Sequence, residues 1–435
     1  MSQQTAIRPG PPPVPTASPG TGPPAGQARR DGVLGPFTRG STPAALGRLR
    51  VLAAVVVIVA TAVSAVLLVL GWDANRSAAA DTEQLIRAQA IKTDLLRADA
   101  LATNAFLVGG LESAAQRSAY DDALTAVTEG IAAAAEAQPA DQQVLARLNT
   151  AVLDYASTME LARANNRQGL PVGSAYLREA SSGLRATALP LTDALVTANA
   201  ARAESSMSGQ HPWLLLLPAV LAVVLLFLVN RWIAARFRRH VNVGLAVAAL
   251  AVVGAGVVAV AAAGTRAGDN DVVRQGSYAV VVDGAAARTA GNDAKASESL
   301  RLIARGSGQA FEDAWTAAAA EVEDALGVAG DATVRAQWQT YVERHAQVVG
   351  LDEDGRWDDA VALATTTGPE GTTGAFTEFD TSMAQVVSDA AASATSSLRG
   401  GTWVLLAAAG LWVVLGGLAA GAAWRGVSVR LGEYS

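Results

Sequence analysis

The chain has no cysteine, only three histidines and few aromatic residues, which make up 5% of its 435 residues. The lack of cysteine excludes disulfides, thiol catalysis and cysteine-ligated metal sites. The chain is instead rich in small apolar residues: 51% of its residues are hydrophobic and 41 are glycine. Together with a positive mean hydropathy, this composition indicates membrane helices with small-residue surfaces.

Enzyme motifs are missing as well. The sequence has no GxxxxGK[ST] phosphate-binding loop and no kinase, phosphatase or cyclase signature. We therefore expect that the protein is not an enzyme and that it has no catalytic residue, no cofactor and no metal site.

Charged residues are absent from four long apolar runs. Each run has about 20 residues, the length that a helix needs to cross a bilayer. The runs are residues 51–70, 212–229, 243–264 and 402–424. In the fourth run Gly417 and Gly421 form a GxxxG pair, which favours close packing between membrane helices.

Positive charge lies on one side of these runs. The N-terminal tail, the short loop NRWIAARFRRHVN and the C-terminal tail together hold 12 basic and 2 acidic residues. Residues 73–211 hold 11 basic and 16 acidic residues, and residues 265–399 hold 10 and 21. Because cytoplasmic flanks of membrane helices are enriched in Lys and Arg, we expect a multi-pass plasma-membrane protein with both termini and the Arg loop in the cytoplasm.

Two interpretations of the Arg loop remain open. As an orientation signal that is attracted to anionic lipid, it needs no further role. A contact surface for a cytoplasmic protein is also compatible with its composition. On that second interpretation the partner-contact candidates are Trp232, Arg236, Phe237, Arg238 and Arg239 in the loop and Arg425 and Arg430 in the C-terminal tail.

The two segments outside the membrane are expected to be helical throughout. Apolar residues recur every three or four positions, as in Leu85, Ala88, Ile91 and Leu95, a spacing typical of amphipathic helices with one buried face. Breaks divide the first segment into four helices, at about 74–108, 114–137, 140–166 and 172–210. Pro190 should kink the last of them.

The second segment repeats patterns of the first. AYDDALTA at 119–126 matches AFEDAWTA at 310–317, and LNTAVLDY at 148–155 matches WQTYVERH at 338–345. Self-similarity at a fixed spacing indicates an internal repeat. We therefore predict an all-α integral membrane protein with four transmembrane helices and two duplicated extracytoplasmic four-helix bundles.

The predicted order begins with a disordered cytoplasmic tail, because ten of the 16 prolines lie in the first 45 residues. The predicted segments are the tail (1–45), the first membrane helix (46–72), the first bundle (73–211), the second membrane helix (212–230), the basic loop (231–242), the third membrane helix (243–264), the second bundle (265–400), the fourth membrane helix (401–424) and the C-terminal tail (425–435).

This layout resembles known sensory proteins. Each half is similar to the periplasmic four-helix sensor bundle of chemoreceptors and histidine kinases. The whole arrangement, with its Pro-rich tail, duplicated bundles, Arg loop and terminal RLGEY (430–434), resembles the actinobacterial GlnX-type membrane proteins. The resemblance implies two partners besides the bilayer: an extracytoplasmic solute-binding lipoprotein that senses an amino acid, and a cytoplasmic Ser/Thr kinase. It implies no nucleic-acid partner and no functional-residue motif.

Other features carry open alternatives. His345 aligns with Tyr155 of the first bundle and is either a core imidazole or a ligand or pH-sensing residue. The acidic stretch at 352–359 is either a solvated loop or a cation site, although it lacks the spacing of a calcium loop. For the whole protein we favour a transmembrane signal relay over a passive membrane scaffold. A transporter is less favoured because the spans lack the charged groups expected of one.

Overall fold

The computed structural model describes residues 33–39, 41–108, 112–209, 211–237 and 241–432. Every regular element in these ranges is a helix, so the protein is an all-α protein. The elements are α1 (Gly35–Thr38), α2 (Thr42–Val108), α3 (Ala114–Ala137), η1 (Pro139–Asp141), α4 (Gln142–Arg167), α5 (Val172–Gly183), η2 (Leu184–Ala188), α6 (Leu189–Ser208), η3 (Pro212–Leu215), α7 (Leu216–Phe237), α8 (Val243–Gln275), α9 (Ser277–Ile303), α10 (Gln309–Ala329), α11 (Ala332–Glu353), α12 (Trp357–Thr365), α13 (Thr372–Arg399) and α14 (Trp403–Gly432).

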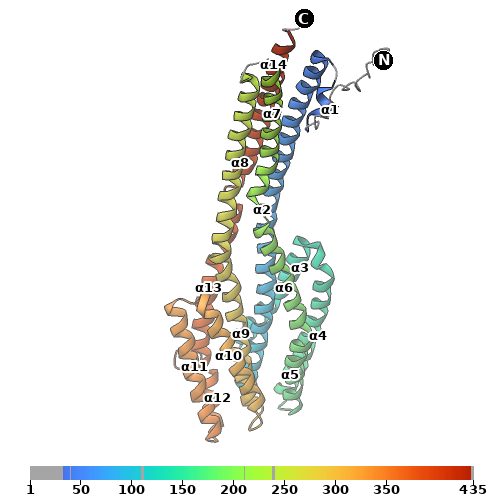
Figure 1. Ribbon diagram of the computed structural model, residues 1–435. Coiled ribbons are helices and arrows are strands. Elements are labelled where there is room, and N and C mark those ends of the chain that lie inside the picture. The colour runs from blue at the N-terminus through green and yellow to red at the C-terminus, as the bar shows by residue number, and fades with distance from the viewer. Residues whose placement is uncertain (1–32, 40, 109–111, 210, 238–240, 433–435) are drawn as a thin grey trace, which may run out of the picture.

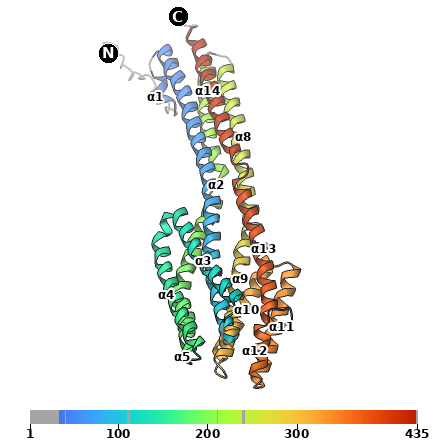
Figure 2. The same cartoon turned by 180° about the vertical axis from the view of Figure 1, so that it is seen from behind.

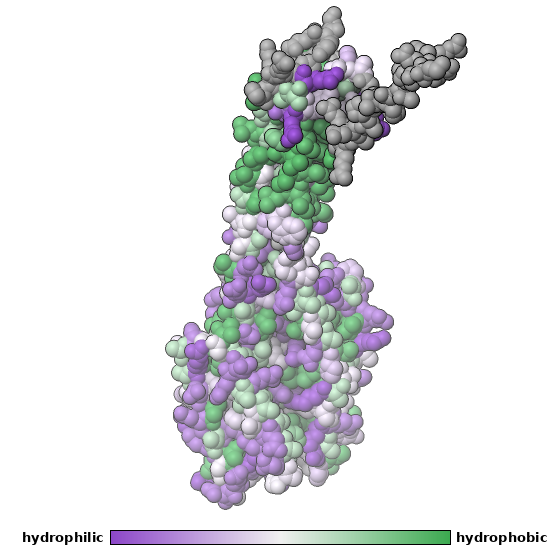
Figure 3. All heavy atoms as spheres, viewed as in Figure 1, coloured by the Kyte–Doolittle hydropathy of each residue, from purple (hydrophilic) through white to green (hydrophobic). Residues whose placement is uncertain are grey.

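The molecule is a rod of membrane-type helices with two helical units at one end (Figure 1). Four helices are long and apolar enough to cross a membrane. They run side by side through the rod, and α1 and the last turns of α14 lie at the end of the rod away from the units, as the reverse view also shows (Figure 2). Figure 3 shows an apolar band across the visible face of the rod and a largely polar surface over the units.

The first unit consists of the part of α2 that extends beyond the rod, together with α3, α4 and the α5–η2–α6 helix. Its helix bounds agree with those expected from the sequence. Ser113 begins α3 with a reciprocal capping box, in which its side chain accepts from the Gln116 backbone and the Gln116 side chain accepts from the Ser113 backbone. Gly169 provides the positive φ of +67° that the turn between α4 and α5 requires. Side chains from all four helices form one apolar core.

The second unit consists of α9, α10, α11 and α13, with the short α12 inserted before the last helix. The expected break at 351–357 separates α11 from α12. A further break after Thr365 divides the returning segment, so α12 and α13 are separate helices. The core of this unit is more aromatic than that of the first, because Trp338, Tyr341 and Phe379 are all fully buried in it.

Glycine contacts hold the membrane rod together, but not at the predicted pair. A Cβ built on Gly417 or Gly421 would meet no atom within 4 Å, so the prediction that these glycines pack the membrane helices of this chain is wrong. One position earlier, a Cβ on Gly416 would lie 2.0 Å from Thr61 Oγ1 of α2. Gly244 of α8 and Gly426 of α14 also meet backbone to backbone. The four-residue spacing of Gly417 and Gly421 predicts that one face of α14 carries glycine. It does not predict which face of α14 is turned toward α2.

Helices extend further at the terminal end than the sequence suggested. α1 and the first turn of α2 lie within the tail predicted to be disordered, because Leu34 packs on the rod and Leu46 is fully buried in it. Helix α7 continues to Phe237, through half of the predicted basic loop. Helix α14 continues to Gly432, where the buried Val427 still packs against the core. The predicted boundaries at 45, 231 and 425 therefore do not coincide with helix ends.

Three of the four connections between rod and units are interrupted. The helix breaks at Gly276 between α8 and α9, at 400–402 between α13 and α14, and between Ser208 and Pro212. Among the described helices, α2 passes without a break from the terminal end to the far tip of its unit. In the second unit α8 and α9 (Val243–Ile303), and α13 and α14 (Thr372–Val429), each continue as one long helix with a local interruption. The expectation that the first and last helix of each unit run on from the membrane helices therefore holds for α2 without interruption and for the second unit with these local breaks.

Candidate functional site

Helix α2 faces α8, α9 and α13 of the second half of the chain, and polar pairs mark this interface at three levels. Close to the rod, Asn270 Nδ2 donates to Asn75 Oδ1 across 2.9 Å, and both side chains are buried. Midway, the hydroxyls of Thr93 and Thr289 lie 3.1 Å apart. Near the far tip, the Asn104 amide donates to the Thr373 hydroxyl. Apolar contacts also cross this interface, since Leu300 of α9 packs with the core of the first unit and Leu107 of α2 packs with Leu302 of the second.

Arg185 joins the units by an ion-pair bridge. Its Nη1 lies 2.8 Å from the fully buried Asp99 carboxylate of α2, and its Nη2 pairs with Asp293 of α9. Asp99 also accepts hydrogen bonds from Ser181 and Tyr155. The buried carboxylate is thus neutralised by a residue that simultaneously holds the other unit.

The backbone at Arg185 is irregular. Residues Leu184–Ala188 form one turn of π-helix directly before Pro190. Because Pro190 has no N–H to give to the preceding turn, the helix accommodates it by this wider turn. The irregularity that the sequence predicted for this helix therefore takes the form of a π-turn, and Arg185 lies inside it.

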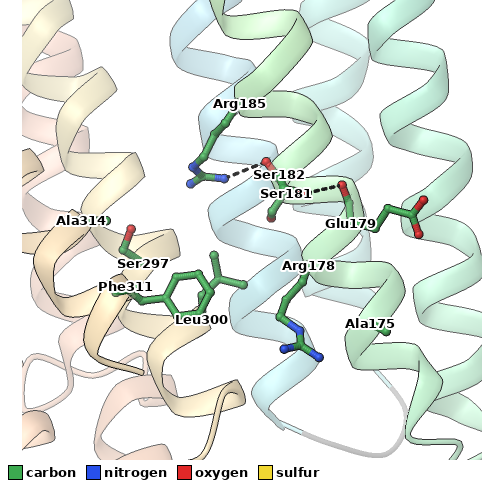
Figure 4. A pocket seen from close by; sticks show the side chains of 11 residues that line it. Ala175, Arg178, Glu179, Ser181, Ser182, Arg185, Ser297, Leu300, Phe311 and Ala314 are labelled. Atoms are coloured by element: carbon green, nitrogen blue, oxygen red, sulfur yellow. Dashed lines mark hydrogen bonds between the residues drawn. The ribbon is translucent and has the colours of Figure 1, made fainter. Parts of the chain in front are cut away.

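A cavity of about 490 Å³ lies beside the bridge, between the two units. Arg178, Ser182 and Arg185 line it from the first unit, and Ser297, Leu300 and Phe311 line it from the second. Figure 4 shows Leu300 and Phe311 facing the two arginines across the gap, while the Glu179 side chain is turned away. Its volume lies within the range of small-molecule sites, about 300–1,000 Å³.

Comparisons with known proteins bear on the first unit. It matches the actinobacterial sensor domain. The match covers residues 74–208, from the outer part of α2 to the end of α6. No curated protein and no solved structure matches the chain. The sensor domain and the four membrane-type helices support a role in sensing or signalling at a membrane.

Opposite the sensor domain, the second unit contains a buried charge network around Glu298. Lys295 Nζ lies 2.6 Å from one carboxylate oxygen of Glu298, and His345 Nδ1 lies 2.9 Å from the other. His345 Nε2 also lies 3.4 Å from Glu312, and its ring stacks on Trp315 with the centroids 3.7 Å apart. His345 is therefore a core residue that links α9, α10 and α11.

Burial and pairing compete in setting the protonation of this network. Burial alone would raise the pKa of Glu298, but the charge of Lys295 and the hydrogen bond to His345 lower it to about 2. Burial alone would lower the pKa of His345, but its hydrogen bonds to Glu298 and Glu312 raise it above 6.5. The hydrogen bond to His345 lowers the pKa of Glu312. A protonated His345 between two carboxylates is the state that these shifts favour.

A loss of stability with rising pH follows from these shifts. Because the pKa of His345 is higher in the folded state, its contribution is complete below pH 6.5 and disappears as the pH rises through the folded pKa. We expect the melting temperature of the second unit to fall as the pH rises through this window. In the variant His345→Gln, which keeps hydrogen-bonding groups but does not titrate, the fall should be smaller. Equal pH profiles for the two proteins would refute this assignment.

The predicted partner-contact residues lie at the terminal end of the rod. Trp232 is partly buried against the rod, Arg236 donates to the Thr42 hydroxyl over 3.2 Å, and Arg425 is exposed. Phe237 and Arg430 lie in the last turns of α7 and α14. Arg238 and Arg239 lie outside the described residues. Arg50 is a further basic residue at this end of the rod. Its guanidinium stacks on Trp424 at 4.0 Å and donates to Ser428.

Arginine side chains form ion pairs with three residues of the acidic stretch at 352–359. Asp352 and Glu353 pair with Arg301 at 3.3 and 3.4 Å, and Asp359 pairs with Arg356. In the ranges that the structure describes, no three His, Asp or Glu side chains are grouped so as to hold a metal ion. The arrangement favours the solvated-loop interpretation over a cation site.

The sequence patterns did not identify the charged residues that pair between the two units or that are buried inside the second unit. Asp99, Arg185, Lys295 and Glu298 were not singled out, although one signal was present. Asp99 follows Leu95 by four positions, so it falls on the apolar stripe of its helix. A charge on a buried stripe requires a partner, but the sequence does not say which arginine supplies it.

Proposed function

We propose that the protein is a transmembrane signal relay. In this proposal the bundles sense an extracytoplasmic solute-binding lipoprotein, loaded with an amino acid, and pass its state to a cytoplasmic Ser/Thr kinase. The sensor-domain match and the membrane-type helices support the general role. The two partners rest on the resemblance of the layout to the GlnX-type proteins.

The observation that carries the proposal is the continuity of α2. Its 67 residues span about 100 Å at 1.5 Å per residue. At the terminal end it meets Arg236 through Thr42 and α14 through Arg50. Further out it provides Asn75, Thr93 and Asp99 to the interface between the units. A shift between the units therefore acts directly on a helix that reaches the other side of the membrane.

The interface combines apolar and polar contacts. Leu300 of α9 packs with the core of the first unit, and Leu107 of α2 packs with Leu302 of the second. Small helix shifts of one or two ångströms transmit signals in many proteins, and polar pairs such as Thr93–Thr289 can re-form after such a shift. In this proposal the breaks at Gly276 and at 400–402 are the points at which the second unit bends relative to its membrane helices.

We further propose that the units arose by tandem duplication and that both face outward. Asn75 and Asn270 are 195 positions apart and Thr93 and Thr289 are 196 apart, yet each pair meets at the interface. Identical residues meet in this way when two repeats pack about a pseudo-twofold axis. The outward orientation rests on the charge distribution, with net positive charge at the terminal end.

A scaffold and a transporter are the competing functions. A passive scaffold has no need for one unbroken helix between interface and terminal end. A transporter needs ionisable groups at membrane depth, and the four apolar runs contain none. The relay therefore has the most support.

Labelling of single cysteines tests the orientation. The chain has no cysteine of its own, so each introduced residue is the only target. We expect Gln142→Cys, at the start of α4, to react with an impermeant thiol reagent in intact cells. Ala234→Cys, near the end of α7, should react only after the membrane is permeabilised. The reverse labelling pattern would place the units in the cytoplasm and would contradict the proposed relay.

A break introduced into α2 tests the relay itself. Replacing Trp72 and Asp73 by glycine creates a three-glycine run with Gly71. This run should uncouple the sensor domain from the membrane, because each added glycine costs about 1 kcal/mol of helix stability. We expect the Ser/Thr phosphorylation response of cells to added amino acids to be lost, while the protein remains folded and inserted.

The matched control lies at the junction between α13 and α14. Thr402→Gly produces the same three-glycine run at 400–402, where the helix is already interrupted. This variant should respond like the wild type. A full response from the α2 variant would show that the continuity of α2 is not needed.

A further inference from the structure

The cavity between the units contains polar groups that the protein leaves without partners. Arg178 has one described hydrogen bond, from Nε to the Ser174 carbonyl of its own helix, and no ion pair with any residue that the structure describes. Ser297 lines the cavity from the second unit, is 2% exposed, and makes no described hydrogen bond. A hydroxyl in the lining that has no described partner in the protein is available to a bound molecule.

Arg185 contrasts with Arg178 and explains why the cavity keeps its shape. Its two Nη atoms pair with Asp99 and Asp293, so Arg185 joins the two walls of the cavity and is engaged by protein carboxylates. Arg178 of α5 lies two helical turns earlier and lines the same cavity (Figure 4). Arg178 is therefore the cation of the lining that has no ion pair among the described residues.

The opposite wall is apolar. Leu300 of α9 and Phe311 and Ala314 of α10 face Arg178 across the gap. An apolar wall with one unpaired cation and one unpaired hydroxyl fits a molecule with an anionic head and an apolar body. A carboxylate suits the head, because its two oxygens match the paired N–H groups of a guanidinium.

We propose that this cavity binds a small organic carboxylate directly, with the carboxylate on Arg178, the apolar body against Leu300 and Phe311, and a polar group on Ser297. Such a ligand touches both units beside the Arg185 bridge and stabilises their contact. The inference goes beyond the proposed relay, in which a separate protein carries the amino acid.

Binding is tested on the purified full-length chain in nanodiscs by calorimetry. The probes are 4-methylpentanoate, L-leucine and benzoate, which share a carboxylate on an apolar body, and 4-methylpentanamide, which has the same body without the charge. We expect at least one carboxylate to bind and the amide not to bind. L-leucine binding more tightly than 4-methylpentanoate would support an amino-acid ligand whose ammonium reaches Ser297. No binding by any of the three carboxylates would overturn the proposal.

Two variants locate the site. Arg178→Gln should weaken carboxylate binding by about tenfold to a hundredfold, the range for loss of a charged hydrogen-bond partner. Arg178 is exposed, so the fold should be unaffected. Arg147→Gln, at an exposed position of α4, is the control and should bind like the wild type. Ala314→Trp should abolish binding by filling the cavity. Unchanged affinity in Arg178→Gln or in Ala314→Trp would overturn the proposed site.

The test is independent of the relay. Binding is measured without kinase or solute-binding protein, so its failure leaves the proposed function untouched. Loss of the relay in the α2 variant would likewise leave carboxylate binding in place.

Discussion

Replacing Lys295 by methionine should destabilise the second unit by about 3–5 kcal/mol, the cost of breaking a buried ion pair. Lys295 and Glu298 have side-chain exposures of 4% and 0%, so water cannot compensate for the lost ammonium. The change also removes the donor to the Ala364 carbonyl and the Thr372 hydroxyl, which ties α9 to α12 and α13. Denaturant titration followed by circular dichroism measures the loss of helix in this variant and in its control.

The matched control is Lys92→Met in the first unit. Lys92 lies 2.7 Å from Asp193, but the aspartate is 56% exposed. An exposed pair of this kind contributes about 0–1 kcal/mol, so the same substitution should have little effect. The double variant Lys295→Met with Glu298→Gln should recover part of the lost stability, since it removes the buried carboxylate that has lost its Lys295 partner and keeps only His345. Similar losses for Lys92→Met and Lys295→Met would show that burial of the network does not decide its energetics.

Gly416→Leu should be strongly destabilising, whereas Gly417→Leu should be tolerated. At Gly416 even the first added carbon would lie 2.0 Å from Thr61 Oγ1 and 2.8 Å from Thr61 Cβ. The threonine cannot rotate away from a contact that includes its Cβ, so α2 and α14 must separate. Overpacking of this kind costs about 1–3 kcal/mol or more.

Thermal unfolding in detergent measures the difference between these neighbouring variants. Gly417 is the control because a side chain there meets open space. If Gly417→Leu unfolds at a lower temperature than Gly416→Leu, the orientation of α14 described here is wrong. Equal stability of both variants would show that close approach of α2 and α14 is not required.

Much of the architecture could be predicted from the sequence because it depends on local patterns. Runs without charge predict membrane helices, and a spacing of three and four predicts buried faces such as that of Leu85, Ala88 and Ile91. Breaks at glycine and proline placed the ends of α3 and α4 within about two residues. These signals arise within one helix and need no knowledge of its neighbours.

The site could not be predicted because it depends on contacts between distant segments. Arg185 meets Asp293 across 108 positions, and Asn75 meets Asn270 across 195. The choice of Gly416 over Gly417 likewise depends on how α14 is rotated against α2. A rotation of one residue, about 100° on a helix, turns a packing glycine into an exposed one. Periodicity alone does not determine that rotation.

The position of α14 has a consequence for biosynthesis. Arg50 of α2 stacks on Trp424, and Thr61 packs on Gly416, so the first membrane helix completes its contacts only when the last has been made. Helix α7 can pack on α2 earlier, but it does not provide the glycine that covers Thr61. Completion of the rod is therefore a late event that follows synthesis of nearly the whole chain. A chain cut short before α14 leaves the face of α2 around Thr61 uncovered and so presents quality-control proteases with a polar group at membrane depth.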